Sequence, residues 1–427
     1  MGGTDRTGAR ARDRRGQRGR EHRSRRALGG VLAILVVAVG LAGCARMPDT
    51  DTFYTAPVTP KQAPGEVVRY RSSTVGDDPI SGQQVPDVQA WQVIYRSTTA
   101  TDQPNVVSGT VIVPTTPWTG EGPRPLVSYG PGTRGVGDRC APSFTLAVGT
   151  DYELGWVKLM LRRGYAVAMT DYEGLGTPGQ HTYMVGRSQG HAALDMARAA
   201  LRLPGAGLGA DTPIALWGYS QGGATSAWAA QLAPDYAPEL HLEAAVMGGV
   251  PADLLAVSQR LDGGLFVSFG LLAALGFDTA YPGLKVQDYL NDKGEELWRT
   301  AQSMCLVGLE GIGTFLGVAG TKLTDYVTTD PRDTPIWKQR LGANKVGASA
   351  PEIPIYQYQG VDDQIAPYAQ AKELRDRWCG EGADVTFVPY TGIEHVGGFL
   401  VGVDPALTYL DQVFAGDVPA GNCRTQF

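Results

Sequence analysis

Residues 213–223 read Pro213-Ile-Ala-Leu-Trp-Gly-Tyr-Ser-Gln-Gly-Gly223, an apolar run followed by glycines around one serine. The apolar run predicts a buried strand, and the small residues after it predict a closely packed helix. Residues Gly218–Gly222 have the form G-x-S-x-G, in which the glycines let a strand turn sharply into a helix and expose the serine. We therefore predict that Ser220 is a nucleophile at the end of a central strand.

The same pattern occurs a second time, as Gly186-Arg187-Ser188-Gln189-Gly190. The residues before it, 176–183, contain Gly, Pro and Thr in the manner of a loop, so no strand leads into this serine. We predict that Ser188 lies near the start of a helix and does not act as a nucleophile.

Around the serine motif, short apolar segments alternate with helical ones, and residues 89–96 and 105–113 suit an antiparallel pair at a sheet edge. Such alternation builds a parallel sheet with helices on both faces, so the predicted fold class is α/β. The G-x-S-x-G motif between a strand and a helix is typical of a core sheet of the α/β-hydrolase type. Further strands are predicted at residues 126–129, 165–170, 214–217, 244–247, 353–359 and 385–389, and helices at 153–163, 191–203, 224–232, 369–379 and 405–414.

No strand is predicted between about residues 251 and 350. This segment contains apolar helical runs punctuated by glycine, such as residues 264–275 and 304–318. We predict a helical cap inserted into the α/β core, which would offer a channel for an acyl chain. The alternative is that these runs are ordinary helices of the core.

A serine hydroxyl needs a positioned base, and the chain has five histidines to supply one. His395 follows the last predicted strand, where α/β-hydrolases place their base, in the chain order serine, acid, histidine. We predict His395 as the base, and we expect His181 to be a loop residue that lines the cleft or packs on it. The other three are His22 in the N-terminal segment, His191 beside the second serine motif and His241 at a strand start.

The third member of a triad is a carboxylate that orients the histidine. Asp362 and Asp363 both follow the strand predicted at residues 353–359, and the spacing from Gly360 and to Pro367 favours Asp363. For Asp362 we expect turn capping or solvation. Glu394 is next to His395 in sequence, but neighbouring loop residues rarely face each other, so we expect it only near the site.

The tetrahedral intermediate of acyl transfer needs two backbone N–H donors, which form the oxyanion hole. One should be the amide of Gln221, directly after the nucleophile. The other should come from the glycine-rich loop at residues 130–135, where we favour Gly132 or Thr133.

The N-terminus carries an export pattern. Residues 1–26 contain ten Arg and three acidic residues, an uncharged apolar run follows, and the segment ends in Leu41-Ala-Gly-Cys44. We predict a lipoprotein-type signal peptide at residues 1–43, lipidation of Cys44 and a Pro-rich tether over residues 44–64, before a hydrolase domain at 65–427. Simple secretion or a retained membrane anchor are the alternatives, and Arg25-Arg26 leaves a twin-arginine export route open. An arm that binds nucleic acid should not run directly into an apolar segment.

The remaining body is acidic and rich enough in cysteine for disulfides. Without residues 1–26 its formal net charge is −13 instead of −6, so a polyanion such as nucleic acid is not an expected ligand. With Cys44 set aside, four cysteines allow two disulfides in an oxidising compartment, in any of three pairings. Because no C-x-x-C pair occurs, we predict no zinc site.

These motifs together resemble the secretory lipase family of the Candida lipase A type, in its actinobacterial branch. The similar segments are Gly132-Thr133, Cys140-Ala-Pro-Ser143, residues 170–179, 186–198, 218–222 and 360–367, and Glu394-His395. The resemblance implies an α/β-hydrolase core with a helical cap, esterase or lipase activity, no metal or cofactor, and the triad named above. It also implies a Cys140–Cys305 disulfide, which leaves Cys379 to pair with Cys423. In the yeast-type enzyme an Asp side chain serves the oxyanion loop, whereas Thr133-Arg134 stands there in this chain.

The sequence therefore predicts an exported serine hydrolase of carboxylic esters, similar to triacylglycerol lipases, that acts through an acyl-enzyme. Acyl transfer or peptide cleavage by the same triad is an alternative, and so is a non-catalytic binding lipoprotein. The expected location is the outer face of a bacterial cell envelope, as a lipoprotein, or the medium, and no obligate protein partner is indicated.

Overall fold

The structure is a computed structural model that describes residues 46–57, 62–77, 87–306 and 309–427. The predicted signal peptide at 1–43 and the predicted lipidation site Cys44 lie outside the described residues. No helix in the described ranges is both long enough and apolar enough to cross a membrane.

The described residues form a mixed sheet of nine strands with the order β1-β2-β3-β5-β4-β6-β7-β8-β9. The first three strands and β5 pair antiparallel, and the strands from β5 to β9 pair parallel. This is the predicted α/β sheet with an antiparallel edge. Its strands are β1 (Val67–Ser73), β2 (Val88–Thr98), β3 (Pro104–Pro114), β4 (Leu126–Gly130), β5 (Ala166–Thr170), β6 (Ile214–Tyr219), β7 (Leu242–Gly248), β8 (Ile355–Gly360) and β9 (Val385–Tyr390).

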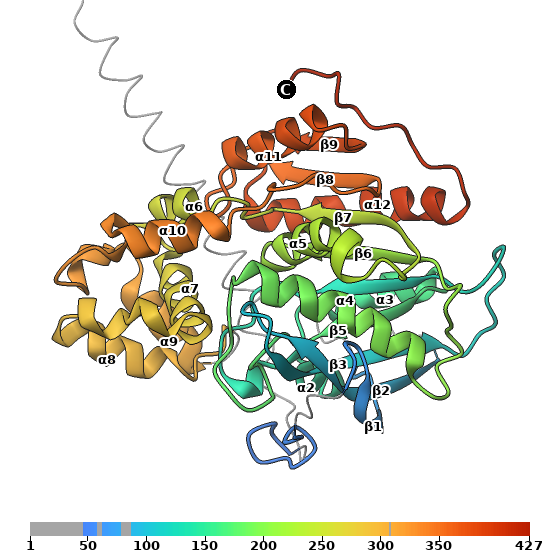
Figure 1. The fold of residues 1–427 in the computed structure, drawn as a ribbon, viewed down its shortest axis with the longest axis horizontal. Coiled ribbons are helices and arrows are strands. Elements are labelled where there is room, and N and C mark those ends of the chain that lie inside the picture. Colours follow the sequence, from blue (N-terminus) through green and yellow to red (C-terminus); the bar gives the residue numbers. More distant parts are fainter. Residues whose placement is uncertain (1–45, 58–61, 78–86, 307–308) are drawn as a thin grey trace, which may run out of the picture.

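Helices cover both faces of the sheet because side chains alternate along each buried strand. Leu126 of β4 packs in the core cluster that contains α4 and α5, whereas Val127 packs in the cluster that contains α3 and α12. Figure 1 shows α4 and α5 against the central strands. The core helices are α2 (Pro142–Ala147), α3 (Leu154–Arg162), α4 (Gly186–Arg202), α5 (Gln221–Tyr236), α11 (Tyr368–Gly380) and α12 (His395–Phe414).

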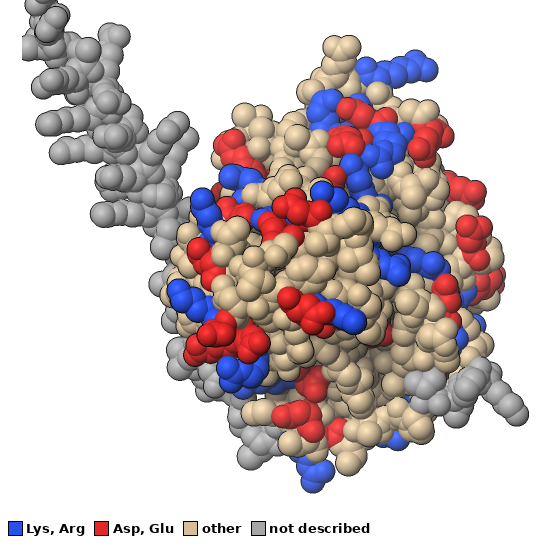
Figure 2. Space-filling model, turned by 60° about the vertical axis from the view of Figure 1, so that its left-hand side comes forward, with Lys and Arg blue, Asp and Glu red and all other residues tan. Residues whose placement is uncertain are grey.

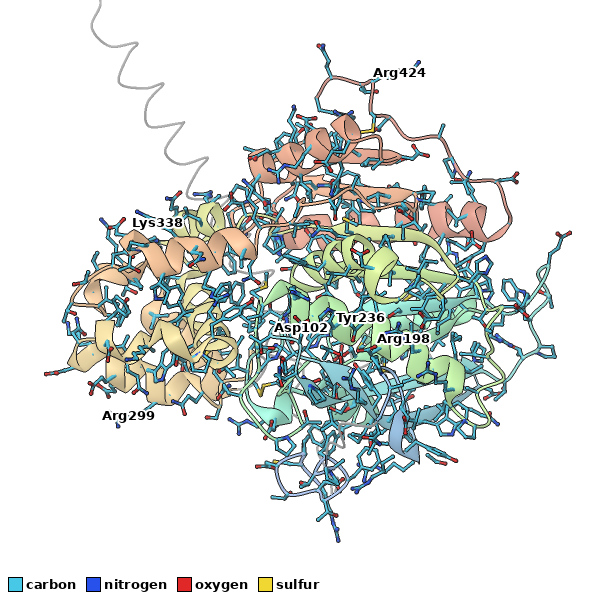
Figure 3. The ribbon with its side chains drawn as sticks, viewed as in Figure 1. Asp102, Arg198, Tyr236, Arg299, Lys338 and Arg424 are labelled. Atoms are coloured by element: carbon cyan, nitrogen blue, oxygen red, sulfur yellow. A yellow bond between two sulfur atoms is a disulfide. The ribbon has the colours of Figure 1, made fainter. Side chains whose placement is uncertain are left out.

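A separate group of helices lies between β7 and β8, beside the sheet at the left of Figure 1. Four of its five helices share a core that includes Leu272, Trp298 and Trp337 and also Tyr183, from the loop before α4, whereas the helix at Leu309–Val318 contributes Phe315 to a second cluster. Arg299 and Lys338 lie on its outer surface (Figure 3). The helices are α6 (Leu254–Leu261), α7 (Val267–Ala280), α8 (Asp292–Ala301), α9 (Leu309–Val318) and α10 (Pro335–Ala343), joined by short 3-10 turns at Pro282–Leu284, Val286–Tyr289, Leu323–Asp325 and Pro331–Asp333.

Several helices differ from the predicted bounds, and for two of them the structure shows a local reason. The helix predicted at residues 304–318 begins at Leu309, because Cys305 forms a β-bridge with Gly135 and is tied to the body. The helix predicted at residues 405–414 begins earlier, at His395, because the Glu394 side chain caps its first turn.

Part of the predicted tether is packed, which corrects that prediction for residues 51–56. Phe53 and Tyr54 are buried, and the Tyr54 hydroxyl lies 2.9 Å from Ser143 Oγ. Arg71 of β1 forms an ion pair with Asp51 at 2.7 Å and lies over the Phe53 ring. Two aromatic side chains and one ion pair thus pack this segment against the folded body, although the prolines around it are typical of a linker.

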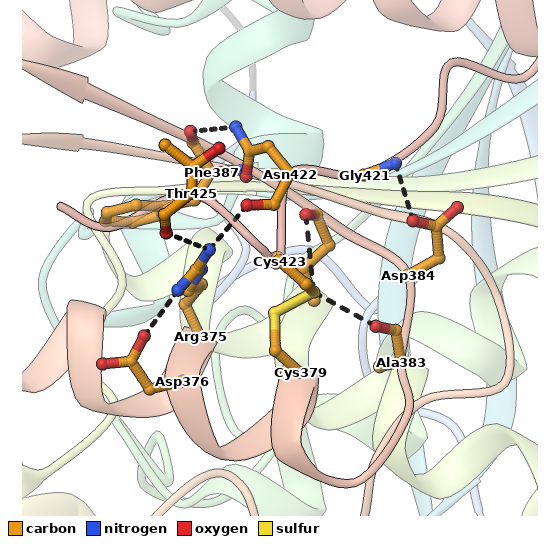
Figure 4. Close-up of a disulfide and its surroundings, with 11 residues drawn as sticks. Arg375, Asp376, Cys379, Ala383, Asp384, Phe387, Gly421, Asn422, Cys423 and Thr425 are labelled. Carbon is orange, nitrogen blue, oxygen red and sulfur yellow. Dashed lines mark hydrogen bonds and ion pairs between the residues drawn. A yellow bond between two sulfur atoms is a disulfide. The ribbon is translucent and has the colours of Figure 1, made fainter.

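Both cysteine pairs implied by the family resemblance are present. Cys140, at the end of the 3-10 turn Asp138–Cys140, is bonded to Cys305, and Cys379 of α11 is bonded to Cys423 near the C-terminus. Figure 4 shows the second bridge, where Arg375 also donates to the backbone carbonyls of Asn422 and Thr425. The first disulfide therefore links the loop after β4 to the helical group, and the second fastens the C-terminal segment to α11.

Charged side chains of both signs are mixed on the surface. On the face shown in Figure 2, acidic and basic residues lie among larger uncharged areas. Arg332, for example, forms ion pairs with both Asp262 and Asp330 at 2.7 Å. On this face neither sign of charge dominates among the described residues.

Candidate active site

Ser220 lies in a strained turn between β6 and α5. Its backbone has φ +58° and ψ −118°, a conformation that non-glycine residues rarely adopt. The backbone of β4 lies so close to Gly222 that a Cβ on this residue would be 1.9 Å from the Gly130 carbonyl oxygen. Only glycine therefore fits at this position of the motif. This strand-turn-helix arrangement is the one that the G-x-S-x-G motif predicts, and the Ser220 side chain is partly exposed.

Ser220, His395 and Asp363 form one chain of hydrogen bonds. His395 Nε2 lies 2.9 Å from Ser220 Oγ, and His395 Nδ1 lies 2.7 Å from Asp363 Oδ2. A carboxylate can only accept, so Asp363 holds the imidazole proton on Nδ1 and leaves Nε2 as the acceptor for the serine hydroxyl. The three side chains come from the loops after β6, β8 and β9, at the carboxyl end of the parallel strands.

The Asp363 carboxylate is fixed by four donors. Besides His395, it accepts from Gln359 Nε2 at 2.8 Å and from the amides of Ile365 at 2.8 Å and Ala366 at 2.7 Å. Asp362, the competing candidate, is exposed. Glu394 accepts from the amides of Val396 and Gly397 and thereby caps α12. Glu394 thus places His395 at the first position of a helix, although it does not contact the imidazole.

His191, His241 and the second serine motif have partners away from Ser220, and His22 lies outside the described residues. Ser188 is buried in the first turn of α4, where it hydrogen-bonds to Glu173 and Thr182. His191 stacks on Tyr236 with ring centroids 4.0 Å apart, and His241 is an exposed partner of a glutamate. These placements agree with the prediction that Ser188 starts a helix.

The loop after β4 corrects one predicted oxyanion donor. The Gly132 amide donates to the Glu153 carboxylate at 3.1 Å, so it is not free for a substrate. Within the described part of the chain, the Thr133 amide has no hydrogen-bond acceptor, and both residues line a cavity at Ser220. Gln221 is the first residue of α5, where an amide has no partner inside its helix. The available pair is therefore Thr133 N–H and Gln221 N–H.

A buried ionic cluster, which the sequence analysis missed, holds this loop. Arg134 donates to Asp151 at 2.8 and 3.0 Å and to Glu153 at 2.9 Å, and its guanidinium lies 3.9 Å from the centre of the Tyr152 ring. The Tyr152 hydroxyl donates to the Thr133 carbonyl at 3.0 Å. Burial raises the pKa of the Glu153 carboxyl, and the adjacent Arg134 guanidinium opposes that rise. We name Arg134, Asp151 and Glu153 the loop clamp.

His181 holds the side chain of Gln221, the residue whose backbone N–H is the second available donor. Its Nδ1 donates to the Glu173 carbonyl at 2.8 Å, which leaves Nε2 to accept from the Gln221 side-chain amide at 3.2 Å. Burial lowers the pKa of the His181 imidazole to about 4, so it is neutral at pH 7. A neutral imidazole is the form that this pair of contacts requires.

Two cavities meet at Ser220. The first extends into the helical group and is lined by apolar side chains of α6, α7 and α8 such as Leu254, Leu271 and Leu297. The second lies between the loop after β4 and the start of α12, and its lining includes Thr133, His395 and aromatic rings. Among the described residues, no group of three or more His, Cys, Asp or Glu side chains could hold a metal ion.

The chain matches a known protein family over most of its length. The family model for secretory lipase matches residues 140–422, well over half of the chain. The chain belongs to the secretory lipase family. It is a lipase-like hydrolase with the α/β-hydrolase fold.

Relatives of this secretory lipase occur in fungi and bacteria. Lipase 4 of Candida albicans is 32% identical over 417 residues, which cover 92% of this chain and 88% of the relative. A secreted triacylglycerol lipase of Malassezia restricta is 30% identical over 363 residues, covering 81% and 75%. A probable inactive lipase of Mycobacterium tuberculosis is 32% identical over 387 residues, covering 87% and 83%. The family thus includes both named lipases and a relative named as inactive.

Solved structures show the same fold. Candida antarctica lipase A in its closed state matches with a TM-score of 0.80 and 25% identity, covering 90% of each chain. A rice cell wall degrading esterase of Xanthomonas oryzae matches with a TM-score of 0.68 and 20% identity, covering 83% of this chain and all of that one. The second likeness shows the fold alone.

Proposed function

We propose that this secretory lipase hydrolyses carboxylic esters through an acyl-enzyme on Ser220. The observation that carries the proposal is the continuous hydrogen-bonded chain from Ser220 through His395 to Asp363. The proposal needs this observation, because one relative is named as probably inactive and membership of the family alone does not establish activity. This chain retains all three side chains in contact.

In the first half of the reaction, Ser220 Oγ attacks the ester carbonyl carbon while His395 Nε2 takes the serine proton. Asp363 stabilises the imidazolium that forms. The carbonyl oxygen becomes negatively charged and accepts hydrogen bonds from Thr133 N–H and Gln221 N–H. When the intermediate collapses, the C–O bond to the alcohol breaks, and His395 Nε2 gives its proton to the leaving oxygen.

In the second half, water takes the place of the alcohol. His395 removes a proton from the water as it attacks the acyl carbon, and the same two amides bind the second oxyanion. Collapse releases a carboxylic acid and returns the proton to Ser220. An alcohol in place of water would give acyl transfer through the same steps.

The helical group between β7 and β8 serves as the cap over the acyl chain. Its cavity reaches Ser220 and is lined mainly by carbon, with Leu254, Leu271 and Leu297 among its walls. Burial of each methylene of an acyl chain there contributes about 0.8 kcal/mol. Together with the Malassezia relative named a triacylglycerol lipase, this cavity supports a fatty acyl ester as substrate.

Export is part of the proposal. Two disulfides in the described residues suit an oxidising compartment. The basic, then apolar segment that ends at Cys44 supports a signal peptide at residues 1–43 and a lipid on that cysteine. The protein would then act at the outer face of the envelope or, if released, in the medium.

The test is hydrolysis of p-nitrophenyl esters, from acetate to palmitate, by the protein that begins at Cys44, beside Ser220→Ala. We expect turnover that needs Ser220 and rises with chain length until the cap cavity is filled. Release of p-nitrophenol in the presence of methanol, with analysis for methyl ester, separates transfer from hydrolysis. Turnover by Ser220→Ala at the wild-type rate, or none by either protein, would contradict the proposal.

A further inference from the structure

The folded body begins within a few residues of Cys44, the proposed lipidation site. The Met47 carbonyl accepts from the backbone amides of Thr50 at 3.0 Å and Asp51 at 2.9 Å, so a hydrogen-bonded turn starts at Met47. Three peptide bonds join Cys44 to Met47. A stretch of that length spans at most about 11 Å, so Cys44 lies within this distance of the turn in any conformation.

Residues 47–56, which we name the docked segment, are fixed to the edge of the sheet. Arg69 of β1 donates to the Thr52 carbonyl at 2.7 Å, and Gln92 of β2 donates to the Tyr54 hydroxyl at 3.2 Å. These contacts add to two buried aromatic rings and an ion pair with β1. The docked segment is therefore a part of the folded body and not a flexible linker.

A lipid on Cys44 would bring the docked segment to the surface of a bilayer. The lipid chains lie in a hydrocarbon core about 30 Å thick, and the headgroups add about 5 to 8 Å on each side. A reach of about 11 Å from Cys44 therefore ends within the headgroups or just outside them. A flexible tether over residues 44–64 would instead let the body move about 25 Å away. The short link leaves the body little choice of the side on which it rests.

The side chains at this end of the body suit a lipid surface. Met47 is 46% exposed, and Arg46 beside it is exposed as well. An apolar side chain next to a basic one fits the boundary between headgroups and acyl chains. Residues 46–57 and β1 together carry three Arg and two Asp, a net charge of +1, whereas the chain beyond residue 26 carries −13. Anionic headgroups would repel the body as a whole but not this side of it.

The docked segment also lies beside the link between the body and the cap. The Tyr54 hydroxyl contacts Ser143, three residues after Cys140, and Cys140 is bonded to Cys305 of the cap. A body that rests on the docked segment therefore has the base of its cap close to the lipids, from which a fatty acyl ester would come.

We propose that the docked segment is a membrane-binding surface that holds the body on a lipid bilayer in one orientation. Figure 1 shows this segment in blue at the lower end of the molecule, and Arg424 lies at the upper end of the same view (Figure 3). A folded domain of this size is roughly 50 Å across, so the two ends lie at very different heights above the lipids. The inference rests on the proposed function, because it assumes the lipid on Cys44.

The first experiment measures the orientation by energy transfer. A fluorescent non-natural amino acid replaces Thr52 or Arg424, which are both exposed, in the lipid-bearing protein isolated from membranes. Each protein is placed in vesicles of phosphatidylethanolamine and phosphatidylglycerol whose headgroups carry an acceptor dye. We expect transfer from position 52 to exceed transfer from position 424 several-fold. Similar transfer from both positions, as a body on a flexible tether would give, would overturn the inference.

The second experiment lengthens the chain on either side of the docked segment. An insert of about 15 Gly and Ser residues between Ala45 and Arg46 adds a reach of about 20 Å between the lipid and the segment. Transfer from position 52 should then fall to the level of position 424. The same insert between Val58 and Thr59 should leave transfer unchanged, because side-chain packing holds the segment on the body. If the two inserts act alike, the docked segment does not orient the protein.

Two further measurements separate this inference from the function on which it rests. Mass spectrometry of the N-terminal peptide reports the lipid: a lipid on Cys44 with equal transfer from both positions would overturn the oriented surface and leave the proposed lipidation intact. Cys44 without a lipid would overturn the proposed lipidation, and the inference with it. Turnover of p-nitrophenyl acetate should be equal in all these proteins, because none of the changes lies at Ser220, and equal turnover shows that each protein folds.

Discussion

The proposed active site has two halves, which differ in the groups that would react and in how those groups are held in place. In the half that we propose transfers protons, the chemistry is assigned to side chains, and Ser220, His395 and Asp363 follow the ends of strands β6, β9 and β8. In the proposed oxyanion half, the chemistry is assigned to neutral backbone amides, and the buried loop clamp of Arg134, Asp151 and Glu153 holds the loop that carries one of them, Thr133 N–H. In the proposed mechanism, ionisable side chains thus take part in the reaction in the first half, whereas in the second half they only hold a loop in place. Loss of a group should therefore cost much more turnover in the first half.

The largest effect is expected in the proton-transfer half. Asp363→Asn should lower kcat by roughly 10⁴-fold, because an amide no longer holds the His395 proton on Nδ1. Asp362→Asn is the matched control, since Asp362 is the exposed neighbour and should retain kcat within about twofold. Steady-state kinetics on one ester measure both. Equal losses in the two variants would contradict the assigned acid.

A smaller loss is expected from the loop clamp. Glu153→Gln should lower kcat by roughly 10- to 100-fold with KM little changed, because the loop that carries Thr133 N–H loses one anchor. The broken ion pair should also cost about 3 kcal/mol of the free energy of unfolding.

Asp195→Asn provides the matched control for the clamp. Asp195 is a buried carboxylate paired with Arg198 at 2.8 Å and bonded to Tyr236, away from both cavities (Figure 3 labels its two partners). It should cost similar stability and leave kcat unchanged. If both variants lose stability and kcat in parallel, the clamp is only a structural feature.

The two disulfides allow a comparison between a bridge next to the proposed site and one away from it, with a smaller expected loss of kcat. The double variant Cys140→Ser, Cys305→Ser frees the loop that carries the Thr133 N–H donor from the cap, and kcat should fall by about threefold. The double variant Cys379→Ser, Cys423→Ser lies away from both cavities and should leave kcat unchanged. Each pair should cost about 2 to 4 kcal/mol of unfolding free energy in denaturant titrations. A larger loss of kcat from the second pair would reverse the account.

The smallest change in turnover is expected from His181, whose effect should appear in the pH dependence of stability. Its pKa is about 4 in the folded protein and near 6.5 when unfolded, so the unfolded chain binds more protons between these values. Stability should fall as the pH drops from about 6.5 to 4, by at most about 3 kcal/mol from this residue. His181→Leu should make that slope shallower, whereas the exposed His241→Leu should not. Denaturant midpoints at several pH values measure the slope.

The two halves of the proposed site differ in how far the sequence predicts them, because one consists of residues in motifs and the other of contacts that form on folding. The sequence predicts Ser220, Asp363 and His395 as the triad because each follows a strand and has a side chain that such a triad needs, and the structure brings the three side chains into contact. The loop clamp could not, because Arg134 and Glu153 meet only through folding and match no motif. The spacing of loop glycines allowed either Gly132 or Thr133 as a donor, and only the Glu153 contact separates them.

The sequence predicted the sheet and its helical layers but missed two local features of the fold. Alternating apolar segments gave the sheet and its two helical faces, since burial on both faces leaves a strong hydrophobic pattern. The packed residues 51–56 were missed because only two aromatic side chains among prolines signal their burial. The early start of α12 was missed because Gly397, Gly402 and Pro405 oppose a helix that Glu394 and tertiary packing nevertheless form.

The central claim, a covalent acyl-enzyme on Ser220, is tested most directly by mass spectrometry. Wild-type protein mixed with p-nitrophenyl octanoate and quenched in acid within the first turnovers should gain the mass of one octanoyl group. Peptide mapping should place that group on Ser220, and Ser220→Ala should gain none. An octanoyl group on Ser188, or its accumulation in Ser220→Ala at the wild-type level, would contradict the account.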